Sequence, residues 1–373
     1  MFYNGSMPIS SFFEKFSPEH IRSLFGEDKR IVGLDIGSTS VKLVQLRTEK
    51  ERAILETYGE VAIGPYQKES VGKVVAISED GMAEIIRDAW QEAKATAKHA
   101  IVGIPLRNSF VTFLDLPTMS DKDLTRAIPF EARKYIPLPL SEVELDWWPV
   151  APITNKEEEG LEMTTVLLAA IQKETISGYK RILEKARINL RGFEIEIFSV
   201  ARIAGRTYRS SLLVLDLGAI STKIAIVDRG ALRMTRALDR GAQAWTLALS
   251  HALGVDFARA EETKRETGIL KRPETEQIRK TFLPLIDAIF QEAKRLLQEY
   301  EQRHQRTVDK VILAGAAALT PGLLDYAVEQ FRREVFLADS FASVSYPPML
   351  SPLINQLGAP FAQAVGLALH GLP

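Results

Sequence analysis

The amino-acid sequence predicts a duplicated α/β fold, because two copies of one β-hairpin pattern lie about half a chain apart. Each copy has an apolar strand, a turn that begins Asp-x-Gly, and a second apolar strand. Asp216 follows Asp35 by 181 residues in a chain of 373. Elsewhere, amphipathic helical periodicity alternates with short apolar runs, which is typical of α/β proteins. We therefore expect two related halves with a cleft between them. The pairs in register are Asp35 and Asp216, Gly37 and Gly218, Ser40 and Ser221, and Lys42 and Lys223.

The first half begins with the hairpin of residues 31–46. Helical spacing of apolar residues then predicts a helix over 82–93, and an apolar run predicts a buried strand over 101–104. Residues from about 106 to 178 are predicted to form an inserted small subdomain. The remaining elements expected here are a strand over 111–116, a helix capped by Ser120 and interrupted at Pro129, two strands around the turn 154–162, a helix over 174–186 and a strand-like segment over 193–197.

The second half repeats this plan with a helical insertion. Its expected elements are the hairpin 212–227, helices over 242–253, 256–267 and 278–302, a strand over 311–314, a helix opening at Pro321-Gly322-Leu323, and a final helix over 361–369. The predicted organisation is an N-terminal segment over 1–29, a first half over 30–209 with its insertion at about 106–178, and a second half over 210–373 with its insertion at about 240–305.

Charge balance and the lack of cysteine exclude several classes of function. With 47 basic and 48 acidic residues the net charge is -1, so we expect no nucleic-acid partner and only indirect membrane contact. Without cysteine there is no disulfide, thiolate metal site or cysteine nucleophile, and the five histidines show no metal-binding spacing. No apolar run is long enough to span a bilayer and no signal peptide is evident, so we expect a cytoplasmic protein.

The N-terminal segment contains a short amphipathic pattern. Phe12, Phe13 and Phe16 precede Ser17-Pro18, which suit an N-cap and a first helical turn. Two roles remain open for this predicted helix. It contacts a partner or a membrane surface, or the segment folds back on the domain or forms a loose tail.

The two Asp-x-Gly turns have the chemistry of a phosphate clamp. Glycine and hydroxyl residues present backbone N–H groups that no strand uses, and Asp supplies a hard oxygen ligand for hydrated Mg²⁺. A single turn of this kind fits equally an Asp that caps its own turn, but two turns in register favour phosphate binding. P-loop and Rossmann sites are excluded, because neither GxxxxGK[ST] nor GxGxxG occurs. Glu261 and Lys264, on one helical face, are either ribose ligands or a surface ion pair.

The order of these motifs resembles the actin, sugar kinase and heat-shock ATPase superfamily over nearly the whole chain. After the second hairpin come an Ala-Glu-x-x-Lys helix and an apolar strand that ends in Gly315-Ala316-Ala317. The resemblance implies two actin-like (ribonuclease H-like) halves with ATP and Mg²⁺ in the cleft. It implies water-mediated Mg²⁺ binding at Asp35 and Asp216, and Glu196 as a water-activating carboxylate, with an exposed strand-end position as the alternative for Glu196. The nucleotide contacts that it implies are Asp35, Gly37, Ser38, Thr39, Ser40, Lys42, Asp216, Gly218, Ala219, Glu261, Lys264, Gly315, Ala316 and Ala317.

Within the superfamily, the segment from Ile128 to Leu138 and the pair Asp146-Trp147 resemble the inserted subdomain of the PilM family of type IV pilus assembly proteins. FtsA, the related division protein, has a C-terminal amphipathic helix, whereas this chain ends directly after its last predicted helix, which favours PilM. The resemblance implies a cytoplasmic platform that binds the N-terminal tail of the membrane protein PilN, other proteins of the pilus inner-membrane complex, and copies of itself. Apolar candidates for the peptide groove are Phe130, Tyr135 and Trp147, with core packing as their alternative role.

Two departures from the superfamily pattern bear on activity. The adenosine turn is Gly-Ala-Ala where Gly-Gly is usual, and the second phosphate turn is Gly-Ala-Ile. Each added Cβ restricts the backbone conformation and its approach to the nucleotide. We still expect ATP to bind, but we expect its hydrolysis to be weak or absent. An FtsA-like filament protein and a sugar or acid kinase of the same superfamily are the alternative functions.

Overall fold

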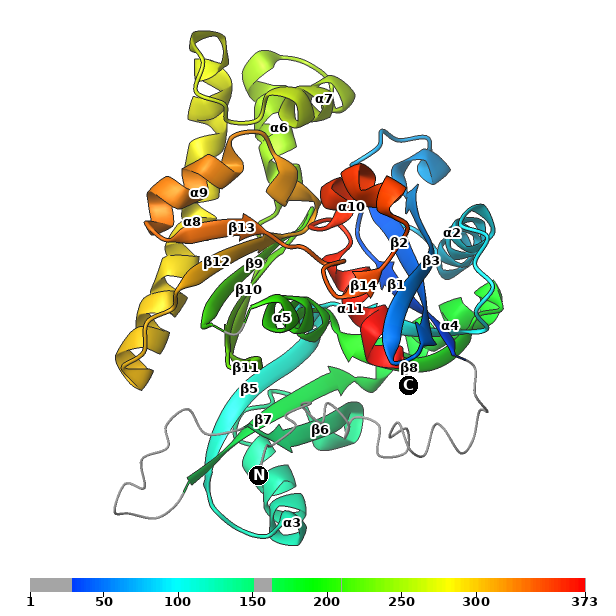
Figure 1. Ribbon diagram of the computed structural model, residues 1–373, viewed down its shortest axis with the longest axis vertical. Helices are drawn as coiled ribbons and strands as arrows, with labels where there is room; N and C mark the ends of the chain where they lie inside the picture. Colours follow the sequence, from blue (N-terminus) through cyan, green and yellow to red (C-terminus); the bar gives the residue numbers. More distant parts are fainter. Residues whose placement is uncertain (1–28, 151–162, 209, 373) are drawn as a thin grey trace.

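A computed structural model describes residues 29–150, 163–208 and 210–372 (Figure 1). The N-terminal helix and the turn 154–162 expected from the sequence lie outside these residues. The first large sheet has the strand order β14-β3-β2-β1-β4-β8. Its strands are β1 (Arg30–Ile36), β2 (Ser40–Glu49), β3 (Arg52–Ala62), β4 (His99–Ile104), β8 (Asn189–Ile195) and β14 (Val344–Ser345).

The second large sheet repeats the order of the first. Its order β11-β10-β9-β12-β13 corresponds strand for strand to β3-β2-β1-β4-β8, with an antiparallel hairpin followed by two parallel strands in each. The predicted duplicated α/β fold is therefore confirmed. The strands are β9 (Leu212–Leu217), β10 (Thr222–Asp228), β11 (Ala231–Leu238), β12 (Lys310–Ala314) and β13 (Glu334–Leu337).

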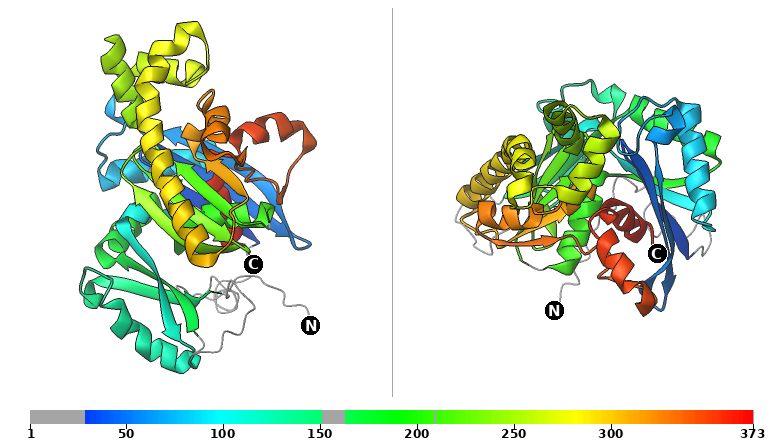
Figure 2. Two further views of the ribbon diagram at one scale, coloured as in Figure 1. Left: turned by 90° about the vertical axis from the view of Figure 1, so that its left-hand side faces the viewer. Right: turned by 90° about the horizontal axis from the view of Figure 1, so that it is seen from above.

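Two helices, α5 (Glu196–Thr207) and α11 (Ala362–Gly371), lie between the sheets and contact each other (Figure 2). α5 packs on β9 and β10, whereas α11 packs on β1 and β4. The approach to β1 depends on Gly33, because a Cβ there would lie 2.0 Å from the Ala364 carbonyl oxygen. α11 and β14 both fall within residues 210–373, yet they join the first sheet.

The other helices cover the outer faces of the two sheets or extend from their edges (Figure 1). No helix among the described residues is both long and apolar enough to cross a membrane. These helices are α2 (Glu79–Glu92) and α4 (Lys173–Ala186) beside the first sheet, and α6 (Ala242–Leu253), α7 (Phe257–Thr267), α8 (Glu276–His304), α9 (Leu323–Phe331) and α10 (Ser351–Leu357) in the rest of the chain.

A third, antiparallel sheet of order β5-β7-β6 lies below the two large sheets in Figure 1. It consists of β5 (Ser109–Pro117), β6 (Val143–Pro149) and β7 (Met163–Gln172), and it packs against α3 (Asp121–Ala132). The expected interruption of α3 at Pro129 is wrong, since the helix continues to Ala132. Ile128 and Ala132, on either side of the proline, are both buried against the third sheet, which holds the two parts in one helix.

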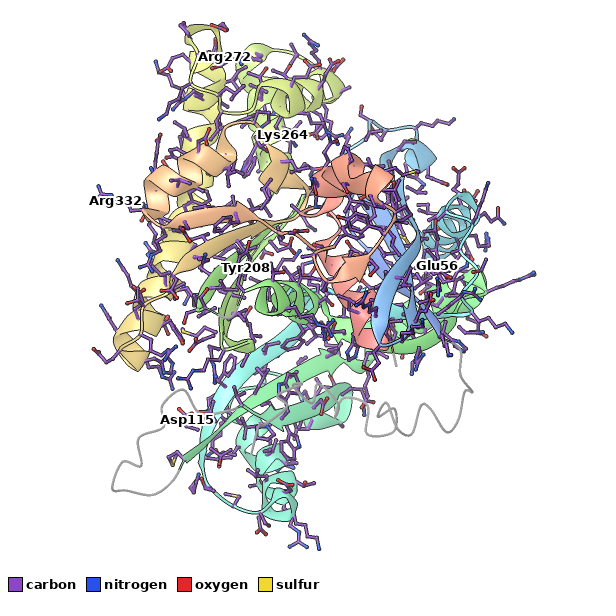
Figure 3. All side chains as sticks on the ribbon, in the orientation of Figure 1. Glu56, Asp115, Tyr208, Lys264, Arg272 and Arg332 are labelled. Carbon is purple, nitrogen blue, oxygen red and sulfur yellow. The ribbon has the colours of Figure 1, made fainter. Side chains whose placement is uncertain are left out.

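The third sheet is attached to two helices that pack on the second large sheet, α8 and α5. Asp115 on β5 forms a 2.8 Å ion pair with Arg303 at the end of α8 (Figure 3). On the other side, the ring of Trp148 on β6 meets that of Phe198 on α5 edge to face, with centroids 5.2 Å apart.

The three apolar groove candidates differ in exposure. Phe130 is 66% exposed and Tyr135 is 48% exposed, so core packing is wrong for both. Trp147 is partly buried against the core of the third sheet, as the alternative role predicts.

Candidate functional site

A cleft of about 710 Å³ lies between the two large sheets, and every site residue predicted from the sequence lines it. The fold therefore brings together positions that are far apart in the chain. The predicted residues on its wall are Asp35, Gly37, Ser38, Thr39, Ser40, Lys42, Glu196, Asp216, Gly218, Ala219, Glu261, Lys264, Gly315, Ala316 and Ala317.

The two Asp-x-Gly turns have the same backbone geometry. The Gly37 N–H donates to the Ser40 carbonyl at 3.0 Å, and the Gly218 N–H donates to the Ser221 carbonyl at 3.1 Å. A Cβ at Gly37 would lie 2.8 Å from the Ser40 carbonyl oxygen, and a Cβ at Gly218 would lie 2.8 Å from the Ser221 carbonyl oxygen. Both turns therefore require glycine. In the first turn, the N–H groups of Ser38 and Thr39 make no hydrogen bond to another described residue, which leaves them as donors toward the cleft.

In the first turn, Asp35 lies opposite Lys42 in the ladder between β1 and β2. The Lys42 ammonium donates to the Ser40 hydroxyl at 2.8 Å and lies 3.2 Å from the Glu60 carboxylate. Burial raises the pKa of Asp35 to about 6, because the charge of Lys42 only partly offsets the loss of water and Glu196 adds repulsion. The Asp35 carboxylate is therefore a hard oxygen ligand without a close cationic partner among the described residues.

In the second turn, one lysine joins two carboxylates. The Lys223 ammonium lies 2.9 Å from Glu196 Oε2 and 3.2 Å from Asp216 Oδ2. Burial alone would lower the pKa of Lys223, but the two carboxylates outweigh it and raise the pKa. Lys223 is thus a charged group shared between β9 and α5.

Glu196 begins α5 directly after β8 and is 6% exposed. The alternative of an exposed strand-end residue is therefore wrong. Its Oε1 accepts a hydrogen bond from the Leu106 N–H at 2.8 Å, while Oε2 faces Lys223. Burial raises the pKa of Glu196, and the charge of Lys223 opposes that shift without cancelling it.

The Glu261–Lys264 pair is buried, so the alternative of a surface ion pair is also wrong. Lys264 lies 2.6 Å from Glu261 Oε2 on α7, and Thr246 of α6 donates to the same oxygen at 2.6 Å. Arg265 pairs with the other oxygen at 2.8 Å. The network fixes both side chains on the cleft wall with their polar atoms satisfied.

The Gly-Ala-Ala turn tolerates its two alanines. Gly315 has φ +83° and ψ 160°, a conformation reserved for glycine, and a Cβ there would lie 2.4 Å from the Leu217 carbonyl oxygen. Ala316 and Ala317 start a 3₁₀ turn, and neither has a positive φ. A second glycine is therefore not needed for this backbone.

Several residues at the cleft were missed in the sequence, and Lys223, Gly72 and Gln243 are three of them. Lys223 stands in register with Lys42, and that correspondence could have identified it. Gly72 has φ +85° and lies against the Glu261 side chain, and the Val74 N–H donates to Gln243 Oε1 at 2.6 Å. This last bond crosses the cleft between residues 169 apart, and no local pattern signals it.

Comparison with known proteins adds independent information. A family model described as "Type IV pilus assembly protein PilM" matches residues 33–372. The chain is 21% identical over 349 residues to the cell division protein FtsA of Enterococcus faecalis, covering 82% of this chain and 78% of that protein.

Two solved structures show the same fold. A PilM-PilN type IV pilus biogenesis complex superposes with a TM-score of 0.78 and 24% identity, covering 92% of this chain and 98% of that one. MreB5 of Spiroplasma citri bound to ADP superposes with a TM-score of 0.55 and 11% identity, covering 92% and 96%. The predicted actin-like form of the two halves is confirmed.

Proposed function

The chain belongs to the family of the type IV pilus assembly protein PilM, and on this premise we propose that it is an ATP-binding platform of the pilus inner-membrane machinery. The family match over residues 33–372 favours this function over the FtsA-like alternative. A kinase needs a further Asp base beside its substrate, but the aspartates among the described residues of the cleft wall are Asp35 and Asp216, one in each turn.

The cleft fits a Mg²⁺-nucleotide in its donors and charges. We assign the phosphates to the two Gly turns with Lys42 and Lys223, and Mg²⁺ to Asp35 and Asp216 through water. Glu261 and Lys264 are assigned to the ribose, and the turn at Gly315 to the adenosine. A bound nucleotide supplies an anionic ligand that contacts both halves and so couples their relative position.

The contacts of Glu196 support a site that binds ATP without hydrolysing it rapidly. A general base needs an oxygen that is free to take a proton from water. Here one oxygen accepts the Leu106 N–H and the other is paired with Lys223. We therefore assign Glu196 no catalytic role.

The proposed partner is the N-terminal cytoplasmic peptide of a PilN-type membrane protein. The solved complex of similar fold contains PilM with PilN. Helix α3, which packs against the third sheet, carries Phe130, and the turn after it carries Tyr135; both are exposed aromatic side chains of the kind that bind peptides. Because the net charge is -1, we propose that the protein reaches the cytoplasmic face of the inner membrane through this partner rather than through a basic surface.

The observation that carries the proposal is the pair of equivalent Gly turns on opposite walls of one cleft. Calorimetry with Mg·ATP tests it: Asp216→Ala should abolish binding, while Asp325→Ala, the same change at an exposed position of α9 outside the cleft, should leave it intact. Unchanged affinity in a folded Asp216→Ala protein would contradict the site.

A pull-down with a PilN-type N-terminal peptide, with and without ATP, tests the partner. Retention of the peptide by the wild type and loss with Phe130→Ala are expected. No binding in either condition would remove this partner.

A further inference from the structure

A continuous set of contacts leads from the second Gly turn to the third sheet. Asp216 at the end of β9 pairs with Lys223 at 3.2 Å, Lys223 pairs with Glu196 at 2.9 Å, and Glu196 accepts the Leu106 N–H at 2.8 Å. Leu106 opens the short 3₁₀ segment Leu106–Asn108, and β5 of the third sheet begins at the next residue, Ser109. Only one turn of chain separates the Glu196 contact from the sheet.

Besides the Glu196–Leu106 bond next to β5, the third sheet contacts α5 at a second place close to Glu196. Phe198, two residues further along α5, contacts the ring of Trp148 on β6. At its far end the sheet is held to α8 by the Asp115–Arg303 pair. The sheet therefore contacts α5, β11 and α8 at separate places, so a displacement at α5 relative to the other two would change its orientation.

The first Gly turn has no comparable connection. Lys42 is equivalent to Lys223, but its ammonium contacts Ser40 and Glu60, which lie on β2 and β3 of the same sheet. Leu106 and Glu196 are both buried, so water does not replace their hydrogen bond. The connection to the third sheet thus starts from the second turn.

We propose that Glu196 is a positioning residue that links occupancy of the second Gly turn to the third sheet through the Leu106 amide. The inference rests on the proposed ATP binding and assigns its regulatory output. Lys223 has three N–H donors and already serves two carboxylates. When Lys223 also faces a phosphate, its hold on Glu196 weakens, and the Glu196–Leu106 bond and the start of β5 adjust. By linkage, a ligand on the third sheet changes nucleotide affinity by the same factor.

The test uses hydrogen–deuterium exchange on the full chain with and without Mg·ATP, followed in peptides covering 106–117 and 143–149. We expect ATP to change exchange there by about fivefold, the low end of typical coupling free energies. Leu106→Pro removes the N–H donor and suits the backbone, because Pro105 has ψ 135° and Leu106 opens a helical turn. Leu106→Ala is the matched control, since it loses the same side chain and keeps the N–H.

Expected results are a response in the wild type and Leu106→Ala, and ATP binding without a response in Leu106→Pro. Glu196→Ala cuts the same bond from the other side and should also lose the exchange response at 106–117 and 143–149 under saturating Mg·ATP, which keeps the test valid if the proline variant does not fold. Equal responses in Leu106→Pro and Leu106→Ala, or ATP binding to the wild type without any response, overturn the link alone. Absence of ATP binding to the wild type overturns the proposed function, and the link with it.

Discussion

Lys42 and Lys223 occupy equivalent positions in the two repeats, yet their ammonium groups have different partners. Lys42 contacts a hydroxyl and a half-exposed carboxylate within its own sheet, whereas Lys223 is enclosed by two buried carboxylates from different elements. The duplication has thus kept the residue and changed its contacts. The two lysines should differ accordingly in their contribution to stability.

Lys223→Met should reduce the free energy of unfolding by about 3–5 kcal/mol, because it leaves Asp216 and Glu196 buried without a cation. Lys42→Met, the matched control, should cost about 1 kcal/mol or less, since the Glu60 side chain is 44% exposed and water can solvate it. Urea unfolding at pH 7 measures both variants. Equal reductions in the free energy of unfolding would show that Lys223 and Lys42 contribute equally to stability and would contradict this prediction.

Gly315→Ala should distort the adenosine turn and weaken nucleotide binding. The φ of +83° costs a Cβ-bearing residue about 1–3 kcal/mol, and the new Cβ collides with the Leu217 carbonyl oxygen. Ala316→Gly, one residue further on, should lower stability by about 1 kcal/mol or less and bring no gain in affinity. Thermal unfolding and calorimetry with ATP test the pair, and tighter binding by Ala316→Gly would mean that the missing glycine does limit the site.

Gln243→Ala should speed the release of nucleotide. The bond from the Val74 N–H to Gln243 Oε1 joins the two walls of the cleft, and a hydrogen bond of about 1 kcal/mol corresponds to about fivefold in rate. Stopped-flow displacement of a fluorescent ATP analogue gives the rate. Gln277→Ala, on α8 and not part of the cleft wall, is the control. An unchanged release rate in Gln243→Ala would show that this contact does not limit exit.

His370→Asn should make the protein less sensitive to acid. The His370 ring lies beside the buried Arg202–Glu194 pair, with Nδ1 3.4 Å from the Arg202 guanidinium. Burial, with the charge of Arg202, lowers the pKa of His370 to about 4 against the opposing effect of Glu194. Between this value and the ordinary value of about 6.5 the unfolded chain binds the proton and the folded chain does not, so stability is complete above pH 6.5 and falls as the pH drops toward 4.

Asparagine cannot take up this proton, and its oxygen can accept from Arg202 in place of Nδ1. Between pH 7 and pH 4.5 the wild type should therefore lose about 2.4 kcal/mol more stability than His370→Asn. Urea unfolding at the two pH values checks this, because all other titrating groups are common to both proteins. Equal losses of stability in the wild type and His370→Asn would show that a group other than His370 causes the acid sensitivity.

The parts of the fold that could be predicted are those whose signals are local. The two hairpins combine apolar strands with a distinctive turn. Helix α2 has one apolar face, and α2 and α7 begin at the capping residues Ser78 and Asp256. The site residues in the two hairpin turns and on α7 were predictable from such signals, and Gly315, Ala316 and Ala317 because they follow an apolar strand. Their convergence on one cleft follows from the duplication, which places equivalent turns on facing walls.

The parts that could not be predicted depend on contacts across the fold. α5 lies between two sheets and buries nearly every residue from Glu196 to Ala204, charged Glu196 included, which depends on contacts with strands distant in the chain. β14 is two residues long and forms only by pairing with Ala53 and Ile54 of β3. The burial of Glu261 and Lys264 likewise depends on α6, which supplies Thr246. The spacing of Glu261 and Lys264 predicts that they share one helical face, but it does not predict that α6 buries them.

The position of α11 has a consequence for how the chain is made. The first sheet begins at Arg30, but the helix that covers one of its faces and the strand that closes its edge come from residues 344–371. During synthesis the apolar face of β1 and β4 therefore stays uncovered until α11 has left the ribosome. Every strand of the second sheet, in contrast, has been synthesised by Leu337. The half that is translated first is thus the half that completes folding last. Nascent chains ending before Ala362 should lose their N-terminal half to protease first, and it is this half that needs protection from aggregation.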